Sequence, residues 1–290
     1  MLAQQVINGL MLGSVYALVA VAFTFTIGIL NFLNFSIPGI FMFAGMLSWA
    51  MLRAGFDLPI VVPAALAAGA VLSWLVERLT WRPAGKSNHY VPLVGSMAFL
   101  ILIENLVLVA WGSDLQRLSL PFADASLRVA GLVIGIPQLV GMSVAIAAVV
   151  GLSLLLKRTR IGRGLRTIAE NTETARLLGV PVRRVVPVVF CTGGLFTALA
   201  GVLFAINYQQ VSPFMGEEIA LKGISAMVIG GMGNIWGAIL GGLIIGVVET
   251  ASINWFGARA VDVAVYGLLL VILFVRPSGL LGGGVARDRL

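Results

Sequence analysis

The sequence is short of charge. Only 11% of its 290 residues are Asp, Glu, Lys or Arg, whereas 59% are hydrophobic, and residues 1–52 contain no Asp, Glu, Lys, Arg or His at all. One continuous helix over that stretch would be roughly 78 Å long at about 1.5 Å per residue, against a hydrocarbon core of about 30 Å. The sequence therefore predicts a membrane protein whose first 52 residues cross twice. The break is expected at residues 31–38, where Asn, Ser and Pro interrupt the apolar run.

Residues that carry chemistry are equally scarce. The single cysteine, Cys191, excludes an intramolecular disulfide, and the single histidine, His89, lies in a polar loop without both a Ser and an Asp nearby and without metal-ligand partners. The glycine-rich run GGMGNIWG lacks the lysine of a phosphate-binding GxxxxGK loop. We therefore expect no catalytic residues, no metal site and no ATP hydrolysis. The net charge of +7 is typical of the cytoplasmic loops of a membrane protein, and we expect no nucleic-acid partner.

What the sequence does contain is a series of apolar runs, each about the length of a membrane span. They predict an all-α, polytopic integral membrane protein with about eight transmembrane segments and a single permease-like domain over residues 1–290. The expected helices lie near residues 6–30, 37–52, 59–77, 91–112, 138–156, 186–207 and 260–276.

The basic residues set the expected orientation. Fourteen of the nineteen fall in three places: three in residues 78–90, eight in residues 157–184, and three from Arg276 to the end. The positive-inside rule places these segments in the cytoplasm, with the N-terminus outside and the C-terminus inside. The remaining five are expected on or near the outer side: Arg53, Arg117, Arg128, Lys222 and Arg259.

With the expected helices and the two ends placed in this way, residues 218–251 must enter and leave the membrane on the same side. Their glycine-rich centre, GGMGNIWGAILGG at 230–242, favours two short or re-entrant helices joined by a tight turn. The alternative is close helix packing through small residues. Together with the break in LNFLNFSIPG at 30–39, this gives one discontinuity in each half of the chain, an arrangement that points to a transport pathway.

Residues 157–184 are the most basic part of the chain. Asn171 is expected to cap a helix starting at Thr172, with Glu173 in its first turn and Gly179 and Pro181 at its end. Upstream, apolar residues at helical spacing predict either one bent helix or two short ones. Three interpretations are open: a basic loop on anionic lipid headgroups, an interfacial anchor helix, or a helix whose apolar stripe docks into a cytoplasmic partner.

Several segments resemble a known family. RGLRTIAEN (163–171) followed by TETARLLGV (172–180) is similar to the coupling motif of permeases from ATP-binding-cassette importers of the branched-chain amino-acid type, with Thr172 in place of a proline and Thr174 in place of an alanine. GLMLGSVYALVAVAFTFTIGILNF (9–32) resembles the opening helix, GGMGNIWGAILGGLIIGVVE (230–249) the glycine-rich region and RPSGLLG (276–282) the ending. NFSIP (34–38) departs from the family's Asn-Phe-Ala-His-Gly element.

The resemblance implies an inner-membrane importer subunit that moves branched-chain amino acids or related small polar solutes. The implied partners are a second permease of different sequence, two cytoplasmic ATPase subunits, a periplasmic solute-binding protein and membrane lipids. The chain itself would need no cofactor, because the ATPase subunits hydrolyse the ATP. The residues implied in ATPase coupling within the cytoplasmic coupling loop 157–184 are Arg166, Ala169, Glu170, Asn171, Ala175, Leu178 and Gly179.

Polar groups and glycines within the apolar segments are candidates for the substrate path. They are Asn31, Asn34, Ser36, Glu104, Gly230, Gly231 and Gly233. Each has a structural alternative: capping of helix ends for the first three, pairing with a neighbouring helix for Glu104, and close backbone approach for the glycines. For Glu249 we expect a structural role, and Glu217 and Glu218 either meet the binding protein or lie in a solvated loop.

Two rival functions remain at this point. A self-sufficient channel or secondary transporter, for urea or amides for instance, would need buried carboxylates to couple an ion, and Glu104 is the one convincing candidate. The other rival is a membrane scaffold without transport.

Overall fold

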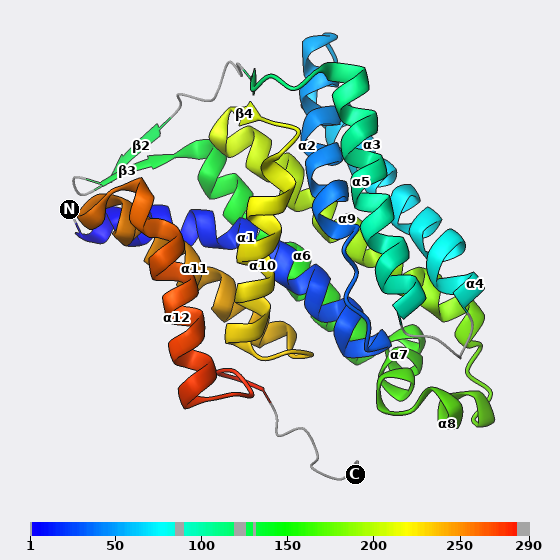
Figure 1. The fold of residues 1–290 in the computed structure, drawn as a ribbon. Coiled ribbons are helices and arrows are strands. Elements are labelled where there is room, and N and C mark those ends of the chain that lie inside the picture. The colour runs from blue at the N-terminus through cyan, green and yellow to red at the C-terminus, as the bar shows by residue number, and fades with distance from the viewer. Residues whose placement is uncertain (1, 85–89, 119–125, 130–131, 283–290) are drawn as a thin grey trace.

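The fold is known from a computed structural model, which describes residues 2–84, 90–118, 126–129 and 132–282. His89 and Lys86, Arg287 and Arg289 therefore lie outside the described residues. The described chain is built from helices with four short strands (Figure 1). The helices are α1 (Leu2–Leu30), α2 (Ile37–Arg53), α3 (Leu58–Val76), the π-helix η1 (Glu77–Trp81), α4 (Arg82–Ala84), α5 (Tyr90–Trp111), α6 (Ile136–Arg158), α7 (Arg160–Glu170), α8 (Thr172–Leu177), α9 (Val182–Tyr208), α10 (Met215–Gly230), α11 (Ile235–Phe256), the 3-10 helix η2 (Ala258–Ala260) and α12 (Val261–Val275).

Seven of the described helices are long and apolar enough to cross a membrane, which confirms an all-helical polytopic protein. They are Leu2–Leu30, Leu58–Trp81, Tyr90–Trp111, Ile136–Arg158, Val182–Tyr208, Ile235–Phe256 and Ala258–Val275. The shorter helix α2 is also apolar. The total of eight segments and the inside–outside orientation stay predictions.

The expected break between the first two helices is present. α1 ends at Leu30, Asn31 has a left-handed backbone with φ of 50°, and α2 begins with Pro38 in its first turn. Proline is favoured there because the first amides of a helix have no intrahelical acceptor. The break predicted at residues 31–38 is therefore confirmed.

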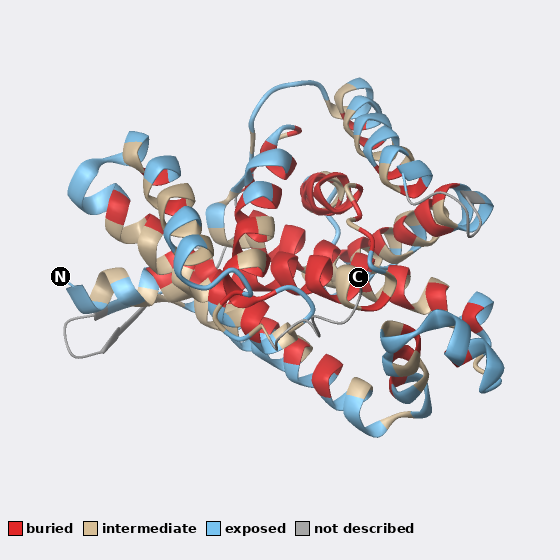
Figure 2. Cartoon of the chain, turned by 60° about the horizontal axis from the view of Figure 1, so that its bottom comes forward, coloured by how far each residue is buried: buried red, intermediate tan, exposed pale blue. Residues whose placement is uncertain are grey.

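Helix α1 forms the centre of the bundle. It packs against α11, α9, α10, α6 and α7, and its residues are buried almost without interruption from Gly13 to Thr26. Figure 2 shows the buried residues gathered along the middle of the molecule and the exposed ones on the peripheral helices. A helix that is apolar on all sides suits such a surrounded position or a position facing lipid.

Small residues let α1 and α11 approach closely. A side chain added at Gly13 would meet the backbone of Gly242 and Leu243, and one added at Gly246 would meet the backbone of Gly9 and Gly13. Within α11, Gly237 and Gly241 lie against the backbone of α10 in the same way. Most of the glycine-rich run thus serves close helix packing, the alternative interpretation of the sequence.

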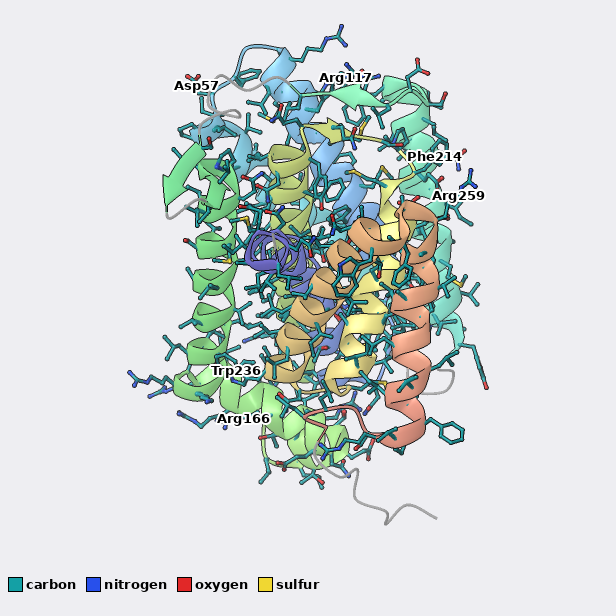
Figure 3. All side chains as sticks on the ribbon, turned by 90° about the vertical axis from the view of Figure 1, so that its left-hand side faces the viewer. Asp57, Arg117, Arg166, Phe214, Trp236 and Arg259 are labelled. Carbon is teal, nitrogen blue, oxygen red and sulfur yellow. The ribbon has the colours of Figure 1, made fainter. Side chains whose placement is uncertain are left out.

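The break in the glycine-rich segment is confined to residues 231–234. Gly231 and Gly233 have positive φ angles of 109° and 86°, and the Oδ1 atom of Asn234 accepts hydrogen bonds from Trp236 N and Gly237 N at 3.0 and 3.2 Å. α10 and α11 form a helical hairpin around this turn. In Figure 3, Phe214 and Arg259, at the outer limits of the hairpin, lie near one end of the molecule and Trp236 toward the other. Whether the hairpin is re-entrant in a membrane stays a prediction.

Two antiparallel strand pairs lie at the end of the molecule opposite α7 and α8 (Figure 1). β1 (Gln116–Arg117) pairs with β4 (Gln210–Val211), so that Gln116 is opposite Val211, and β2 (Ser126–Val129) forms a hairpin with β3 (Leu132–Gly135). These strands were not predicted from the sequence. The α7–α8 end also carries α4 and the last described residues, which all belong to the segments expected in the cytoplasm.

Candidate functional site: the α7–α8 segment and the helix discontinuities

The basic segment folds into two consecutive short helices. The side chain of Thr159 caps α7 by accepting a hydrogen bond from Gly162 N at 3.0 Å. Asn171 has extended backbone between the helices, and its Oδ1 atom accepts hydrogen bonds from Glu173 N at 2.9 Å and Thr174 N at 3.0 Å. Gly179, with a φ of 80°, ends the segment. The cap at Asn171 and the stop at Gly179 are confirmed.

The apolar stripe of this segment faces its own helix bundle. This corrects the interpretation in which the stripe docks into a cytoplasmic partner. Leu165, Ile168 and Ala175 are 0%, 2% and 0% exposed and belong to the main hydrophobic core. α7 packs against α6, α1 and α9. The stripe therefore fastens the segment to its own bundle and does not enter a partner's groove. Helical spacing identified the apolar face but gave no information on what would cover it.

A different apolar pair faces outward. Leu177 and Leu178, at the end of α8, are 89% and 70% exposed. Their neighbours in the proposed coupling set divide between the two faces: Ala169 packs against the core and Ala175 is buried, whereas Arg166, Glu170, Asn171 and Gly179 are exposed. The segment is thus anchored on one face and presents two leucines among charged residues on the other.

Next to α8 lies an open, positively charged hollow. It has a volume of about 610 Å³ and is lined by Arg176, Pro181, Val182, Arg183 and Arg184. Arg183 and Arg184 occupy the first turn of α9, where the helix dipole disfavours positive charge. Negatively charged groups outside the first turn of α9 would therefore be needed to balance the positive charge of these arginines.

The cap itself gives a testable prediction. We expect Asn171→Ala to weaken α8, because an Ala at this position leaves Glu173 N and Thr174 N without a side-chain acceptor, a loss of about 1 kcal/mol. Hydrogen exchange of the amides of residues 172–177 measures it, and Asn171→Asp, which retains the acceptor, is the matched control. Equal protection in all three proteins would show that the cap does not hold α8.

At the first discontinuity, the polar groups are already engaged with each other. The Oδ1 atom of Asn34 accepts hydrogen bonds from Ser36 N at 3.0 Å and Ser36 Oγ at 2.7 Å, and Phe35 N donates to Ser96 Oγ of α5 at 3.0 Å. Asn34 and Ser36 are buried, whereas Asn31 is exposed. This geometry is that of a turn that prepares the start of α2, the structural alternative for these residues.

Glu104 lies on α5, eight residues beyond Ser96, which is about 12 Å along the helix. Its side chain is half-buried, and its neighbour Asn105 donates to Ile101 O of the same helix at 2.8 Å. Across the described part of the chain, no hydrogen bond or ion pair of Glu104 is found. The pairing with a neighbouring helix that was one of its two interpretations is therefore not present there.

The three candidate glycines of the second discontinuity contact backbone. Gly230 lies against Gly237 in the hairpin, Gly231 against Ser278 and Gly282 of the C-terminal segment, and Gly233 against Gly28 of α1. The C-terminal segment closes over the turn: Leu280 N donates to Ile229 O and Leu281 N to Gly230 O, at 2.8 and 2.9 Å, while Asn234 Nδ2 donates to Leu281 O at 2.7 Å. The carbonyls at the end of α10 thus gain partners from a segment 51 residues further along the chain.

Lys222 was expected on or near the outer side, and its side of the membrane stays a prediction. It lies inside the bundle, 9% exposed, with its Nζ atom 2.7 Å from Oε1 of Glu249. Tyr16, on α1, donates a hydrogen bond to the other carboxylate oxygen at 2.7 Å. An isolated lysine in an apolar run signals a buried partner, so the pair could have been sought in the sequence. Nothing in the sequence indicated Tyr16.

The protein-family comparison identifies this architecture. Residues 5–274 match the model of the family described as branched-chain amino acid transport system / permease component. This chain belongs to that family. The permease is also 32% identical to the high-affinity branched-chain amino acid transport system permease proteins BraD of Pseudomonas aeruginosa and LivH of Escherichia coli K12, in each case over 96% of this chain and 95% of the relative. It is 26% identical to the ribose import permease protein RbsC of Haemophilus influenzae, over 96% and 86% of the two chains.

Solved structures show the same fold at low sequence identity. The permease superposes on a chain of PsaBC from Streptococcus pneumoniae with a TM-score of 0.53 and 15% identity, covering 93% of this chain and 91% of the other. A putative metal-chelate type ABC transporter in an inward-facing conformation gives a TM-score of 0.52 and 17% identity, with coverages of 94% and 85%. The family and the apolar helices together establish a multi-pass inner-membrane permease. In the described residues, no group of three or more His, Cys, Asp or Glu side chains could hold a metal ion.

Proposed function

We propose that this permease forms the translocation path of an ATP-binding-cassette importer for branched-chain amino acids or related small polar solutes. The observation that carries the proposal is the α7–α8 segment, which is fixed to the bundle by buried Leu165 and Ile168 and presents exposed Leu177 and Leu178. An element that transmits movement from a partner to the bundle needs two such faces, one rigidly attached to the bundle and one free to bind the partner. The family of transport permeases supplies the context.

The partners follow from this arrangement. Two cytoplasmic ATPase subunits would dock at α8 of this permease and of a second permease of different sequence, so that the α7–α8 end faces the cytoplasm. Arg166, Glu170 and Asn171 would orient the docked subunit, with Gly179 fixing the turn beside Leu178. Because α7 packs on α1 and α6, closure of the ATPase subunits would be transmitted to the centre of the bundle.

The opposite end would receive the periplasmic solute-binding protein. Glu217 and Glu218 occupy the first turn of α10, where negative charge is favourable to the helix, and both side chains are exposed at that end. Residues 218–251 would then enter and leave the membrane from the periplasmic side. These two exposed carboxylates would bind a basic surface of that protein.

The substrate is proposed from the relatives and from the helix breaks. The names of the relatives at 32% identity specify branched-chain amino acids. Asn31, Asn34, Ser36 and Glu104 would be the polar groups nearest the path in the first half of the chain, and Gly230, Gly231 and Gly233 would allow the backbone of the second half to shift. The ribose permease at 26% identity shows that related chains accept other polar solutes, so urea and amides are included in the test below.

A self-sufficient channel or secondary transporter is the alternative. Coupling to an ion would require an available buried carboxylate. Glu249 is engaged by Lys222 and Tyr16, which leaves buried Glu77 and half-buried Glu104 among the described carboxylates. This function predicts solute movement without any ATPase.

The docking proposal is tested by Leu178→Asp. We expect an ATPase to co-purify with the wild-type permease from detergent-solubilised membranes and to be lost from the variant, because a charge in an apolar contact carries a desolvation cost of a few kcal/mol. Leu178 is 70% exposed, so the permease itself should fold normally. Ile161→Asp, the same new charge at an exposed apolar position of α7, is the matched control and should retain the ATPase. Retention by Leu178→Asp would remove α8 as the docking element.

A further inference from the structure

A buried charged cluster links three helices of the permease. Lys222 Nζ on α10 lies 2.7 Å from Glu249 Oε1 on α11 and donates a weaker hydrogen bond of 3.3 Å to Tyr16 OH on α1. Tyr16 OH donates in turn to Glu249 Oε2 at 2.7 Å. The ammonium group also lies 5.6 Å from the centre of the Tyr16 ring. Tyr16, Glu249 and Lys222 are 1%, 8% and 9% exposed.

Stability alone does not account for this cluster. Two charges inside a membrane domain carry a large desolvation cost, and apolar residues of similar size often serve a buried position equally well or better. What an ion pair with a shared hydrogen-bond donor adds is direction, because its bonds form at one relative position of the helices only. The role of the cluster is therefore best sought in the relative position of the three helices, which it fixes.

The surfaces it joins have little else to fix their relative position along the helix axes. α1 and α11 meet through glycines, with Gly13 and Gly246 at the closest approach, and α1 meets Gly223 of α10 through Val19. Contacts between small residues allow close packing but include no hydrogen bond or charge that would select one relative position. The three polar side chains supply the directional contacts that these surfaces lack.

We propose that Tyr16, Lys222 and Glu249 are positioning residues that lock α1 and the α10–α11 hairpin into one moving unit during transport. The inference rests on the proposed importer function. At its other end, α1 packs against α7, and Gly28 of α1 lies against Gly233 in the hairpin turn. A displacement of α7 then reaches the hairpin through α1. With the cluster intact, the hairpin follows α1, and without it the two slip past each other.

The test uses the complete importer in proteoliposomes, with leucine uptake and ATP hydrolysis measured on the same preparation. The double variant Lys222→Met/Glu249→Leu removes both charges together and should keep the amount of folded complex and its basal ATP hydrolysis. We expect leucine moved per ATP hydrolysed to fall about tenfold, the effect of losing one or two charge-assisted hydrogen bonds. The charge swap Lys222→Glu/Glu249→Lys should recover most of the loss. Asp262→Asn, an exposed carboxyl on α12, is the matched control.

Wild-type transport per ATP in the double variant would overturn the proposal and reduce the cluster to packing. A charge swap no better than the double variant would overturn it as well. Hydrogen exchange tests the lock without transport: amides of residues 215–230 and 235–256 should exchange faster in the double variant, and unchanged exchange would contradict the lock whatever solute moves. Failure of the wild-type complex to couple ATP to uptake would instead refute the importer function.

Discussion

Gly246→Leu is expected to prevent the permease from accumulating as a folded protein. The added side chain would occupy the space of the backbone of Gly9 and Gly13 on α1, which cannot move aside as a flexible side chain could. Overpacking costs typically about 1–3 kcal/mol when side chains can readjust, and more where backbone must shift. Because α1 is the centre of the bundle, separating it from α11 disrupts the contacts of the whole domain.

The measurement is the yield of monodisperse permease in detergent, by fluorescence-detected size exclusion. Gly267→Leu is the matched control, because a side chain added at Gly267 on α12 meets no atom within 4 Å among the described residues. It should leave the yield near that of the wild type. Equal yields for the two variants would show that the close contact between α1 and α11 is not required for folding.

Leu165→Asp is expected to separate ATP hydrolysis from transport. Leu165 is 0% exposed and fastens α7 to the bundle, so a carboxylate there carries a desolvation cost of several kcal/mol and releases the segment. The exposed leucines of α8 remain, and the ATPase subunits should still bind. We therefore expect ATP hydrolysis close to wild type with little or no solute uptake.

The control for this effect is Ile161→Asp. Ile161 lies on the same helix but is 47% exposed, so the same new charge stays in water and transport should continue. The result expected for Leu165→Asp, loss of transport with ATP hydrolysis retained, differs from that for Leu178→Asp, in which the ATPase no longer binds. Transport by Leu165→Asp at the wild-type rate, or loss of the ATPase from it, would contradict the division of α7–α8 into an anchored and a docking face.

The positions of the spanning helices could be predicted closely from the sequence. α2 was expected at 37–52 and occupies Ile37–Arg53, and α9 was expected at 186–207 and occupies Val182–Tyr208. A membrane allows few solutions for an apolar run, because each backbone polar group must be satisfied within its own segment. Local capping was predictable because its contacts are close in sequence: Asn171 contacts amides two and three residues away.

Contacts between distant segments could not be predicted. The inward direction of the Leu165 stripe, the pairing of Lys222 with Glu249 and the closure of Leu280 and Leu281 over the hairpin turn all depend on which helices become neighbours. Charge counting also gave no sign that Lys222 is buried, because the positive-inside rule applies to residues outside the spans. Hydropathy identifies an apolar helix face but does not indicate which helix packs against it.

The most direct test of the importer function is leucine uptake into proteoliposomes that contain the permease, its partner permease and the ATPase subunits, with the solute-binding protein present on the periplasmic side. The account predicts uptake that requires ATP, stops when the ATPase subunits are omitted, and is competed by isoleucine and valine but not by urea or acetamide. Uptake that continues at the same rate without ATP or ATPase subunits would contradict it and establish a channel or secondary transporter.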